Sequence, residues 1–434
     1  MFIKTGGEQN LLRGKQLVER LKSRDLSLFP NAKSIAYYDE ISQHIFFDTI
    51  ERADVSNEHE TSLKNMKIMA HELQHWADHL STLWGQKSLI SIYNSINTWE
   101  KSDEGDFWRL RLLWKEINNG KLSRYYTTTN NDLSGASSEP WKWALSAGLK
   151  FDSSGWLDKQ SPVIFTRFRT QNDVPVARTP FSIGSLLEVN SMATEFQIHS
   201  SYLRSLDKDE QIVELSLLKG ESWEWLYNPE FTMYTVAAHF AANSLGIDDI
   251  ILAYLIAKEV STICLNMSDD FYDQLRIPNL FAEVFGERNI ELIKNRDKGY
   301  LFAAIFQNLN ETYKGKENEI DEGHTLIDEL LKVSNLPSLE EQYKQTLMEM
   351  ETLKENIIAG PFSQQLMSRL NMGIGLYVKR GFSGYKVGNI FELIEDSNYA
   401  PFVFGDDLFE SPNWIEYAGN FYDKLVEFNN ICGL

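Results

Sequence analysis

A chain of 434 residues is longer than a single hydrophobic core usually serves, so we expect a catalytic domain with an added lobe. Hydrophobic residues make up 43% of the sequence and aromatic residues 12%, which excludes a largely disordered protein. The formal net charge of −20 repels phosphate groups, and no stripe of Lys and Arg reverses it locally. We therefore expect neither nucleic-acid nor membrane partners.

Cysteine content and hydropathy favour a soluble protein of the cytoplasm. Cys264 and Cys432 lie in apolar surroundings and are too few for a disulfide framework or a cysteine-based zinc site. The N-terminus has no apolar signal segment, and the longest apolar run, residues 250–257, is far shorter than a membrane span. These features predict a soluble, cytoplasmic protein with two reduced thiols.

The first part of the chain mixes helical and strand patterns. Residues 10–23 have apolar positions at helical spacing and predict a first helix, and the β-rich runs 34–38 and 44–50 predict a hairpin. Residues 86–119 again follow a helical pattern. Residues 120–182 contain many Gly, Ser and Pro and predict an irregular segment with strands at YYTTT and VIFTRFR.

The rest of the chain predicts helix after helix. A strong helix starts near Ile183, and the polar run 310–324 is the best candidate for a linker. The expected fold is mostly α with a small β element. It comprises an α+β catalytic domain over residues 1–310, with an insertion around 86–182, and a helical and mixed C-terminal lobe over residues 320–434.

The most informative segment is a single helix predicted over residues 62–85, with Ser56 or Asn57 as its cap and Gly85 as its stop. Its middle reads HELQH, at positions 71–75. Residues four apart lie on one face of a helix, so both histidines of this run can bind one cation. Zinc favours nitrogen ligands, and a catalytic zinc takes three protein ligands and leaves one position for water.

Glu72 follows the first histidine directly, so its carboxylate can reach a metal-bound water without binding the metal. In that position it accepts the proton of the water and returns it to the leaving group. Because zinc lowers the pKa of a bound water from about 15.7 towards ~7, one carboxylate suffices as the base. The spacing therefore predicts His71 and His75 as Zn²⁺ ligands and Glu72 as the general base. His79 lies too far along the helix to share the ion and is expected to be structural or to support a ligand.

The third ligand must come from elsewhere in the chain. Glu188 lies in an otherwise apolar helix with small neighbours, where an unpaired carboxylate would be costly. Glu195, seven residues further on, shares that helix face and is the rival: it is either the ligand itself or an acceptor for a ligand histidine. We favour Glu188 and leave Glu195 open.

An HExxH run on one helix with a Glu from a later helix resembles the gluzincin branch of the zincin metallopeptidases. The resemblance implies a zincin-like catalytic domain, a zinc cofactor and a protein or peptide substrate. It implies His71, His75 and Glu188 as the zinc ligands and Glu72 as the general base. The predicted hairpin upstream lies where zincin proteases have the edge strand that binds peptide.

Gluzincin-like sites usually add a side chain that hydrogen-bonds the oxygen on which negative charge develops. Tyr202, Tyr234 and His239 are the candidates, and each lies in a predicted helix where core packing explains it equally well. The sequence does not choose among them.

The expected function is that of a zinc-dependent hydrolase, a cytoplasmic metalloprotease with a narrow substrate or gated by a regulatory protein partner, as in bacterial toxin or phage-defence systems. The aromatic-rich tail after residue 360 predicts a recognition or regulatory lobe. The alternative is a non-catalytic helical interaction protein with a structural or decayed metal site. A di-iron carboxylate bundle would need a second Glu-x-x-His, and Glu195 and His199 are four residues apart instead.

Overall fold

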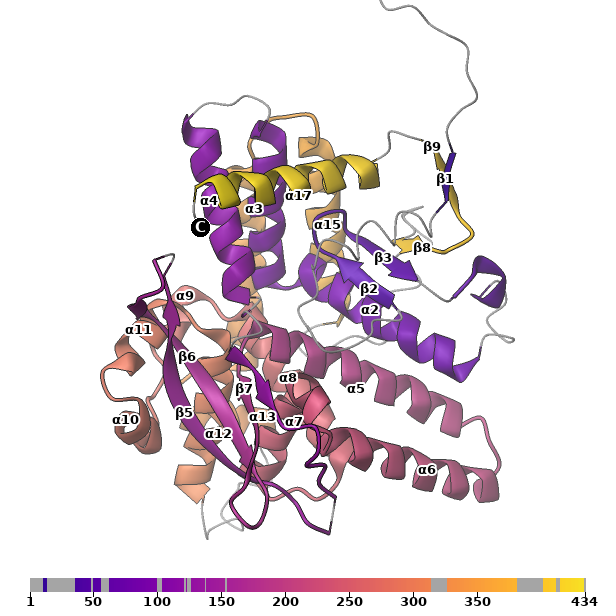
Figure 1. Cartoon of the computed structure of the whole chain (residues 1–434), viewed down its shortest axis with the longest axis vertical. Coiled ribbons are helices and arrows are strands. Elements are labelled where there is room, and N and C mark those ends of the chain that lie inside the picture. Colours follow the sequence, from indigo (N-terminus) through magenta and orange to yellow (C-terminus); the bar gives the residue numbers. More distant parts are fainter. Residues whose placement is uncertain are drawn as a thin grey trace, which may run out of the picture.

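The computed structural model confirms the expected mostly α-helical fold with a small β element (Figure 1). The structure describes residues 11–13, 36–47, 50–55, 62–99, 104–120, 122, 126–136, 138–152, 154–313, 326–380, 401–410 and 414–432. The α-helices are α2 (Leu63–Ser81), α3 (Leu83–Thr98), α4 (Glu104–Gly120), α5 (Ile183–Leu203), α6 (Lys208–Leu226), α7 (Thr232–Leu245), α8 (Ile250–Asn266), α9 (Asp269–Tyr272), α10 (Asn279–Phe285), α11 (Arg288–Lys294), α12 (Lys298–Tyr313), α13 (Leu326–Val333), α14 (Leu339–Leu353), α15 (Ser363–Arg380) and α17 (Trp414–Ile431). Short 3₁₀ helices are η1 (Arg52–Val55), η3 (Pro229–Phe231) and η5 (Lys354–Asn356).

The described strands form small sheets at separate places. They are β1 (Leu11–Arg13), β2 (Ala36–Asp39), β3 (His44–Phe47), β4 (Thr128–Thr129), β5 (Lys142–Phe151), β6 (Leu157–Arg169), β7 (Pro175–Pro180), β8 (Phe402–Val403) and β9 (Leu408–Glu410). Strand β1 pairs with β9, the order β2-β3-β8 makes a second sheet, and β4-β7-β6-β5 makes a third. Strands β2 and β3 pair antiparallel, which confirms the predicted hairpin.

Two apolar cores meet at the packed pair of helices α2 and α5 (Figure 1). The first core joins α5, α7, α8 and α12 to strands β6 and β7. The second joins α2 and α3 to α15, α17 and strand β3. Residues after 360 therefore share a core with the HELQH helix, and β8 extends the sheet of the β2–β3 hairpin. The proposed linker overlaps the end of α12, and its residues 314–324 lie outside the described residues.

The prediction of one helix over residues 62–85 is wrong. Helix α2 ends at Ser81, and Thr82 adopts an extended conformation and caps the start of α3, with its side chain accepting from the Gly85 N–H at 3.0 Å. Gly85 is no stop but lies inside α3, where an added Cβ would lie 2.3 Å from the backbone oxygen of His79. The start is capped by Ser62, whose hydroxyl accepts the Asn65 N–H at 3.2 Å. The proposed caps, residues 56 and 57, lie outside the described residues.

Two other sequence predictions need correction. Leu11–Arg13 form strand β1 rather than the start of a helix, and the rest of the predicted helix lies outside the described residues. The segment 120–182 is more regular than expected, because β5 and β6 form a long antiparallel hairpin. Strand β5 has a small-residue sequence with weak strand propensity, so its pairing with β6 decides its conformation.

The described residues contain no single helix that is both long and apolar enough to cross a membrane. Pro229–Leu245 and Ile250–Asn266 meet that test only together, across a 102° bend. Most residues of α7 and α8 are buried in the first core.

Candidate metal centre

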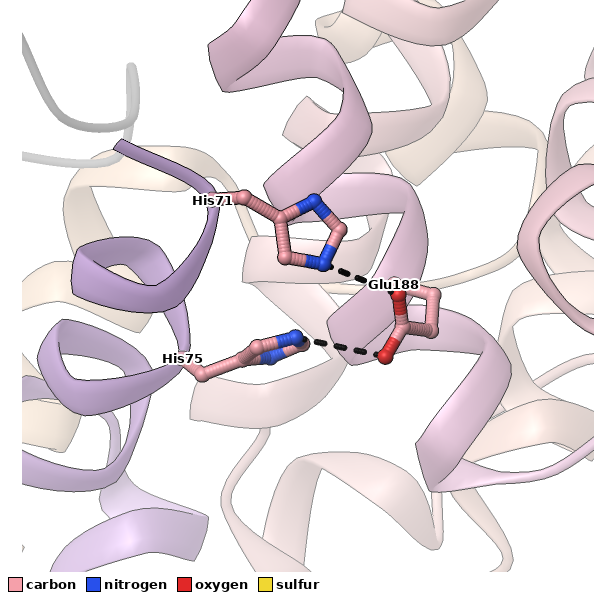
Figure 2. A group of neighbouring side chains, drawn as sticks. All are labelled: His71, His75 and Glu188. Atoms are coloured by element: carbon pink, nitrogen blue, oxygen red, sulfur yellow. Dashed lines mark ion pairs between the residues drawn. The ribbon is translucent and has the colours of Figure 1, made fainter. Parts of the chain in front are cut away.

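Helices α2 and α5 bring His71, His75 and Glu188 together (Figure 2). The Nε2 atom of His71 lies 3.3 Å from Glu188 Oε2, and the Nε2 atom of His75 lies 3.2 Å from Glu188 Oε1. One candidate ligand atom from each residue lies within 4.8 Å of the others. In the described part of the chain, no other group of three His, Cys, Asp or Glu side chains converges in this way.

The helices explain this convergence. One turn of α2 separates its two histidines and points both imidazoles at α5. On α5, the small residues Ser191 and Ala193 are fully buried, which fits close packing of the two helices. Glu188 faces the pair with a side chain that is only 2% exposed.

The donor set suits a divalent metal. Two imidazole nitrogens and a carboxylate oxygen are the ligands of many three-residue catalytic zinc sites. Apart from its ion pair to His71, the buried Glu188 Oε2 has no hydrogen-bond partner among the described residues. A cation held between these atoms would satisfy that oxygen and both imidazoles, so the residues present fit the expected ion.

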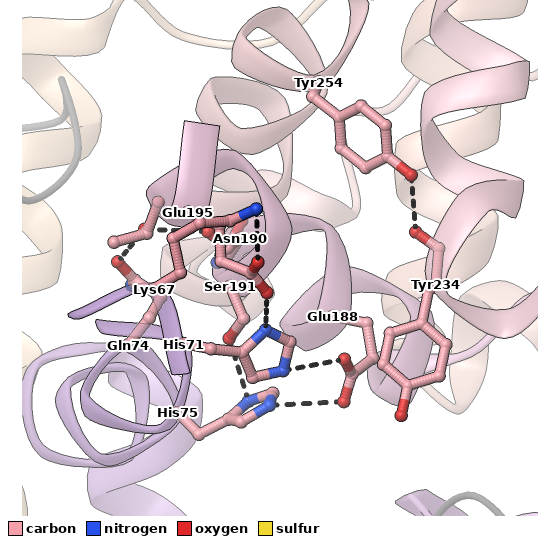
Figure 3. Close-up of polar contacts among 11 residues, drawn as sticks. Lys67, His71, Gln74, His75, Glu188, Asn190, Ser191, Glu195, Tyr234 and Tyr254 are labelled. Carbon is pink, nitrogen blue, oxygen red and sulfur yellow. Dashed lines mark hydrogen bonds and ion pairs between the residues drawn. The ribbon is translucent and has the colours of Figure 1, made fainter. Parts of the chain in front are cut away.

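The second ring nitrogen of each histidine also has a partner (Figure 3). Glu195 Oε1 lies 2.8 Å from His71 Nδ1, and the Ser191 hydroxyl lies 3.3 Å from His75 Nδ1. Lys67 lies 3.7 Å from the other oxygen of Glu195. Glu195, the rival ligand of the sequence analysis, thus contacts the side of the imidazole that faces away from the converging group. Such contacts fix the ring orientation of metal-binding histidines.

A buried polar network joins α2, α5 and α8, and its members on α5 and α8 were not predicted from the sequence. Asp78 accepts hydrogen bonds from Gln74 Nε2 and Asn190 Nδ2, both at 2.8 Å. Thr194 donates to Gln74 Oε1 at 2.8 Å and accepts from the buried Lys258 ammonium at 2.7 Å. The signal in the sequence is the pair of polar residues Asn190 and Thr194, which lie one turn apart in α5. The network fixes the position of α5 on α2, and so of the candidate ligands.

Glu72 is buried and lies close enough to His71, His75 and Glu188 for their charges to shift the pKa of its carboxyl. Burial raises the pKa of its carboxyl, and the neighbouring imidazoles of His71 and His75 act in the opposite direction. The backbone N–H of Tyr38, in β2, hydrogen-bonds the carboxylate and also lowers its pKa. The first strand of the predicted hairpin therefore passes next to the expected base.

The charges of the group complement one another. Burial by itself lowers the pKa of His71, but hydrogen bonds to Glu188 and Glu195 raise it well above the ordinary value of 6.5. Burial opposes ionisation of Glu188, yet His75 and His71 lower the pKa of its carboxyl to about 2. These carboxylates stabilise positive charge between the helices, which is the electrostatic requirement for a cation.

Of the candidates for oxyanion stabilisation, Tyr234 lies beside the group (Figure 3). Its ring centroid is 6.4 Å from that of His71, and burial and the nearby carboxylates raise its pKa well above 10, so it remains an O–H donor. Tyr202 is exposed near the end of α5. His239 Nε2 lies 2.8 Å from the backbone oxygen of Leu226, and burial lowers the pKa of His239 to about 4.

His79 lies outside the group, as its spacing predicts. Its Nδ1 atom lies 3.2 Å from the backbone oxygen of His75, and its ring packs against Tyr38 and Trp84. The side chain is 4% exposed and Nε2 lies 3.6 Å from a carboxylate oxygen of Glu40. These contacts give it a role in packing α2 against β2 and the start of α3.

Comparison with protein-family models, with curated proteins and with solved structures found no significant match. The gluzincin resemblance thus rests on the residues quoted for it above.

Proposed function

We propose that this chain is a zinc-dependent metalloprotease that acts in the cytoplasm. The observation that supports the proposal is the convergence of His71, His75 and Glu188 beside the buried Glu72. Two imidazoles and one carboxylate leave a tetrahedral zinc ion one position for water. A buried carboxylate next to that position is the arrangement required for metal-assisted hydrolysis.

In this proposal, His71, His75 and Glu188 hold the ion, and Glu195 and Ser191 keep the two imidazoles oriented. A bound zinc ion would act as a Lewis acid and would lower the pKa of a water molecule to about 7. The protein supplies rigid donors, because both helices are fixed by the polar network at Asp78.

Glu72 accepts the proton of the attacking water and delivers it to the leaving amine. Its burial suits this task, since burial raises the pKa of the carboxyl and so makes the carboxylate a stronger base. Tyr234 donates a hydrogen bond to the substrate oxygen that gains negative charge. The substrate in this proposal is a protein or peptide.

Zinc content tests the ligand set. Elemental analysis should find one zinc per wild-type chain and none in His71→Ala or Glu188→Ala. His79→Ala is the matched control, because it removes a histidine of the same helix outside the group and should keep its zinc. Stoichiometric zinc in Glu188→Ala would remove Glu188 from the ligand set, and two iron equivalents without zinc would indicate a di-iron site.

Turnover tests the general base. Proteomic comparison of cells that express wild type or Glu72→Gln should reveal cleavage products that only the wild type makes. The variant should retain zinc and fold while its rate falls by about 10²–10⁴, the usual contribution of a general base. The same products in equal amount from both proteins would refute the role of Glu72. A zinc-loaded wild type without cleavage products would favour the non-catalytic interaction protein.

A further inference from the structure

A row of aromatic side chains borders the candidate metal centre on the side of α6 and α7. Trp225, near the end of α6, lies 6.4 Å from Phe231 in η3, and Phe231 lies 6.0 Å from Tyr234, measured between ring centroids. The ring of Tyr234 lies 6.4 Å from that of His71. The row Trp225–Phe231–Tyr234 therefore leads directly to a candidate ligand.

The other end of this row, at Trp225, is also connected to His71, through Lys67 and Glu195. The ammonium group of Lys67 lies 5.4 Å from the centroid of the Trp225 ring and 3.7 Å from Glu195. Glu195 in turn contacts His71 Nδ1 at 2.8 Å. The aromatic row, the ammonium group and the carboxylate thus form one continuous border around the His71 side of the site.

The row keeps apolar surface in contact with solvent. Trp225 is 37% exposed and Phe231 is half-buried, whereas rings within the neighbouring core, such as Phe196 and Tyr254, are buried. Neighbouring aromatic surface that stays exposed next to a functional group is typical of ligand contact. The ammonium group of Lys67 at the edge of the row disfavours a basic side chain there, and an apolar one avoids that repulsion.

From this geometry we propose that Trp225 and Phe231 bind an aromatic or large aliphatic side chain of the peptide held at the metal centre. The inference rests on the proposed protease function and specifies its substrate class. These two residues determine specificity, since they contact a side chain of the substrate and not the bond that is cleaved. The expected consequence is a preference for peptides that carry a large apolar residue.

The test uses two probes that bind a zinc ion through the same hydroxamate group and differ in their apolar tails. Acetohydroxamic acid carries a methyl group, and 3-phenylpropanohydroxamic acid carries a phenyl ring in its place, joined through a two-carbon chain. Calorimetry of both probes on zinc-loaded protein gives the ratio of their dissociation constants. Trp225→Ala and Phe231→Ala should each reduce the preference for the phenyl probe by about two- to tenfold, as expected for one lost aromatic contact.

The methyl probe serves as the internal control, because its affinity should stay unchanged in every variant that folds. Phe231→Leu provides a milder variant that keeps apolar volume in the row. The matched control is Trp156→Ala, which removes a tryptophan that is 75% exposed in the β5–β6 turn and should leave the ratio unchanged. A wild-type ratio in both Trp225→Ala and Phe231→Ala, with the methyl probe bound, overturns this inference alone. A wild type that holds no zinc or binds neither probe overturns the proposed function and this inference with it.

Discussion

The contact between Glu195 and His71 offers a quantitative test of how the second ring nitrogen controls metal binding. Glu195 Oε1 lies 2.8 Å from His71 Nδ1, and its side chain is 12% exposed, so water competes little for the bond. Glu195→Gln keeps the shape and one acceptor oxygen but removes the charge. Glu195→Ala removes the acceptor as well.

Loss of such a partner usually weakens metal binding by about 10–100-fold, or about 1.4–2.7 kcal/mol. We expect Glu195→Gln near the lower end of that range, because the amide oxygen still orients the ring, and Glu195→Ala near the upper end. Competition with a zinc-sensitive chelator of known affinity measures the change. Both variants should still bind one zinc at saturation.

Glu214→Gln is the matched control. Glu214 also contacts a histidine, since its Oε1 lies 3.1 Å from His199 Nε2, but that pair joins α5 to α6 away from the converging ligands. Its zinc affinity should equal that of the wild type. A change of less than twofold in Glu195→Ala would refute the reasoning, as would an equal loss in Glu214→Gln.

Three further predictions concern stability, measured by urea unfolding. An added Cβ at Gly373 of α15 would lie 1.8 Å from the backbone oxygen of Leu80, so Gly373→Ala should lower the free energy of unfolding by about 1–3 kcal/mol or more. Gly375 has open space around the added Cβ, so Gly375→Ala should raise the free energy of unfolding by up to about 1 kcal/mol. Equal effects of the two substitutions would contradict this packing of α15 on α2. Asp78→Ala leaves two buried amide donors without their acceptor, at about 1–3 kcal/mol each, so a loss of about 2–6 kcal/mol is expected and one below 1 kcal/mol would contradict it. Burial lowers the pKa of His239 to about 4, so its contribution to the free energy of unfolding is complete above pH 6.5 and is lost as the pH falls towards 4. His239→Gln should flatten that pH dependence by up to about 3 kcal/mol over this interval, and an unchanged profile would refute it.

Zinc binding should also release a proton. His71 holds a proton near neutral pH in the metal-free protein, because the two neighbouring carboxylates raise its pKa well above 6.5 despite its burial. A metal ligand must be deprotonated, so the apparent zinc affinity should rise with pH until that pKa is passed. Calorimetry in buffers of different ionisation enthalpy measures the released proton. A binding enthalpy that is the same in all buffers would contradict the shifted pKa.

The sequence by itself determined the local features. Helical periodicity places His71 and His75 on the same face of a helix, one turn apart, because the backbone geometry fixes that spacing. Helical periodicity also predicts the helix that starts at Ile183 and the mostly helical fold, and two neighbouring β-rich runs predict the β2–β3 hairpin. Each of these follows from residues close together in the chain.

The tertiary structure decided which distant groups meet. Glu188 and Glu195 share a face of α5 but lie about 10 Å apart along its axis, so the position of α5 on α2 selects the one that faces both histidines. The break at Thr82 also involves a distant residue, since Asn266 Oδ1 at the end of α8 accepts the Leu83 N–H at 3.0 Å. Tyr234 stands beside His71 because α7 packs against α5. Packing between segments far apart in the chain sets these contacts, and no local pattern encodes it.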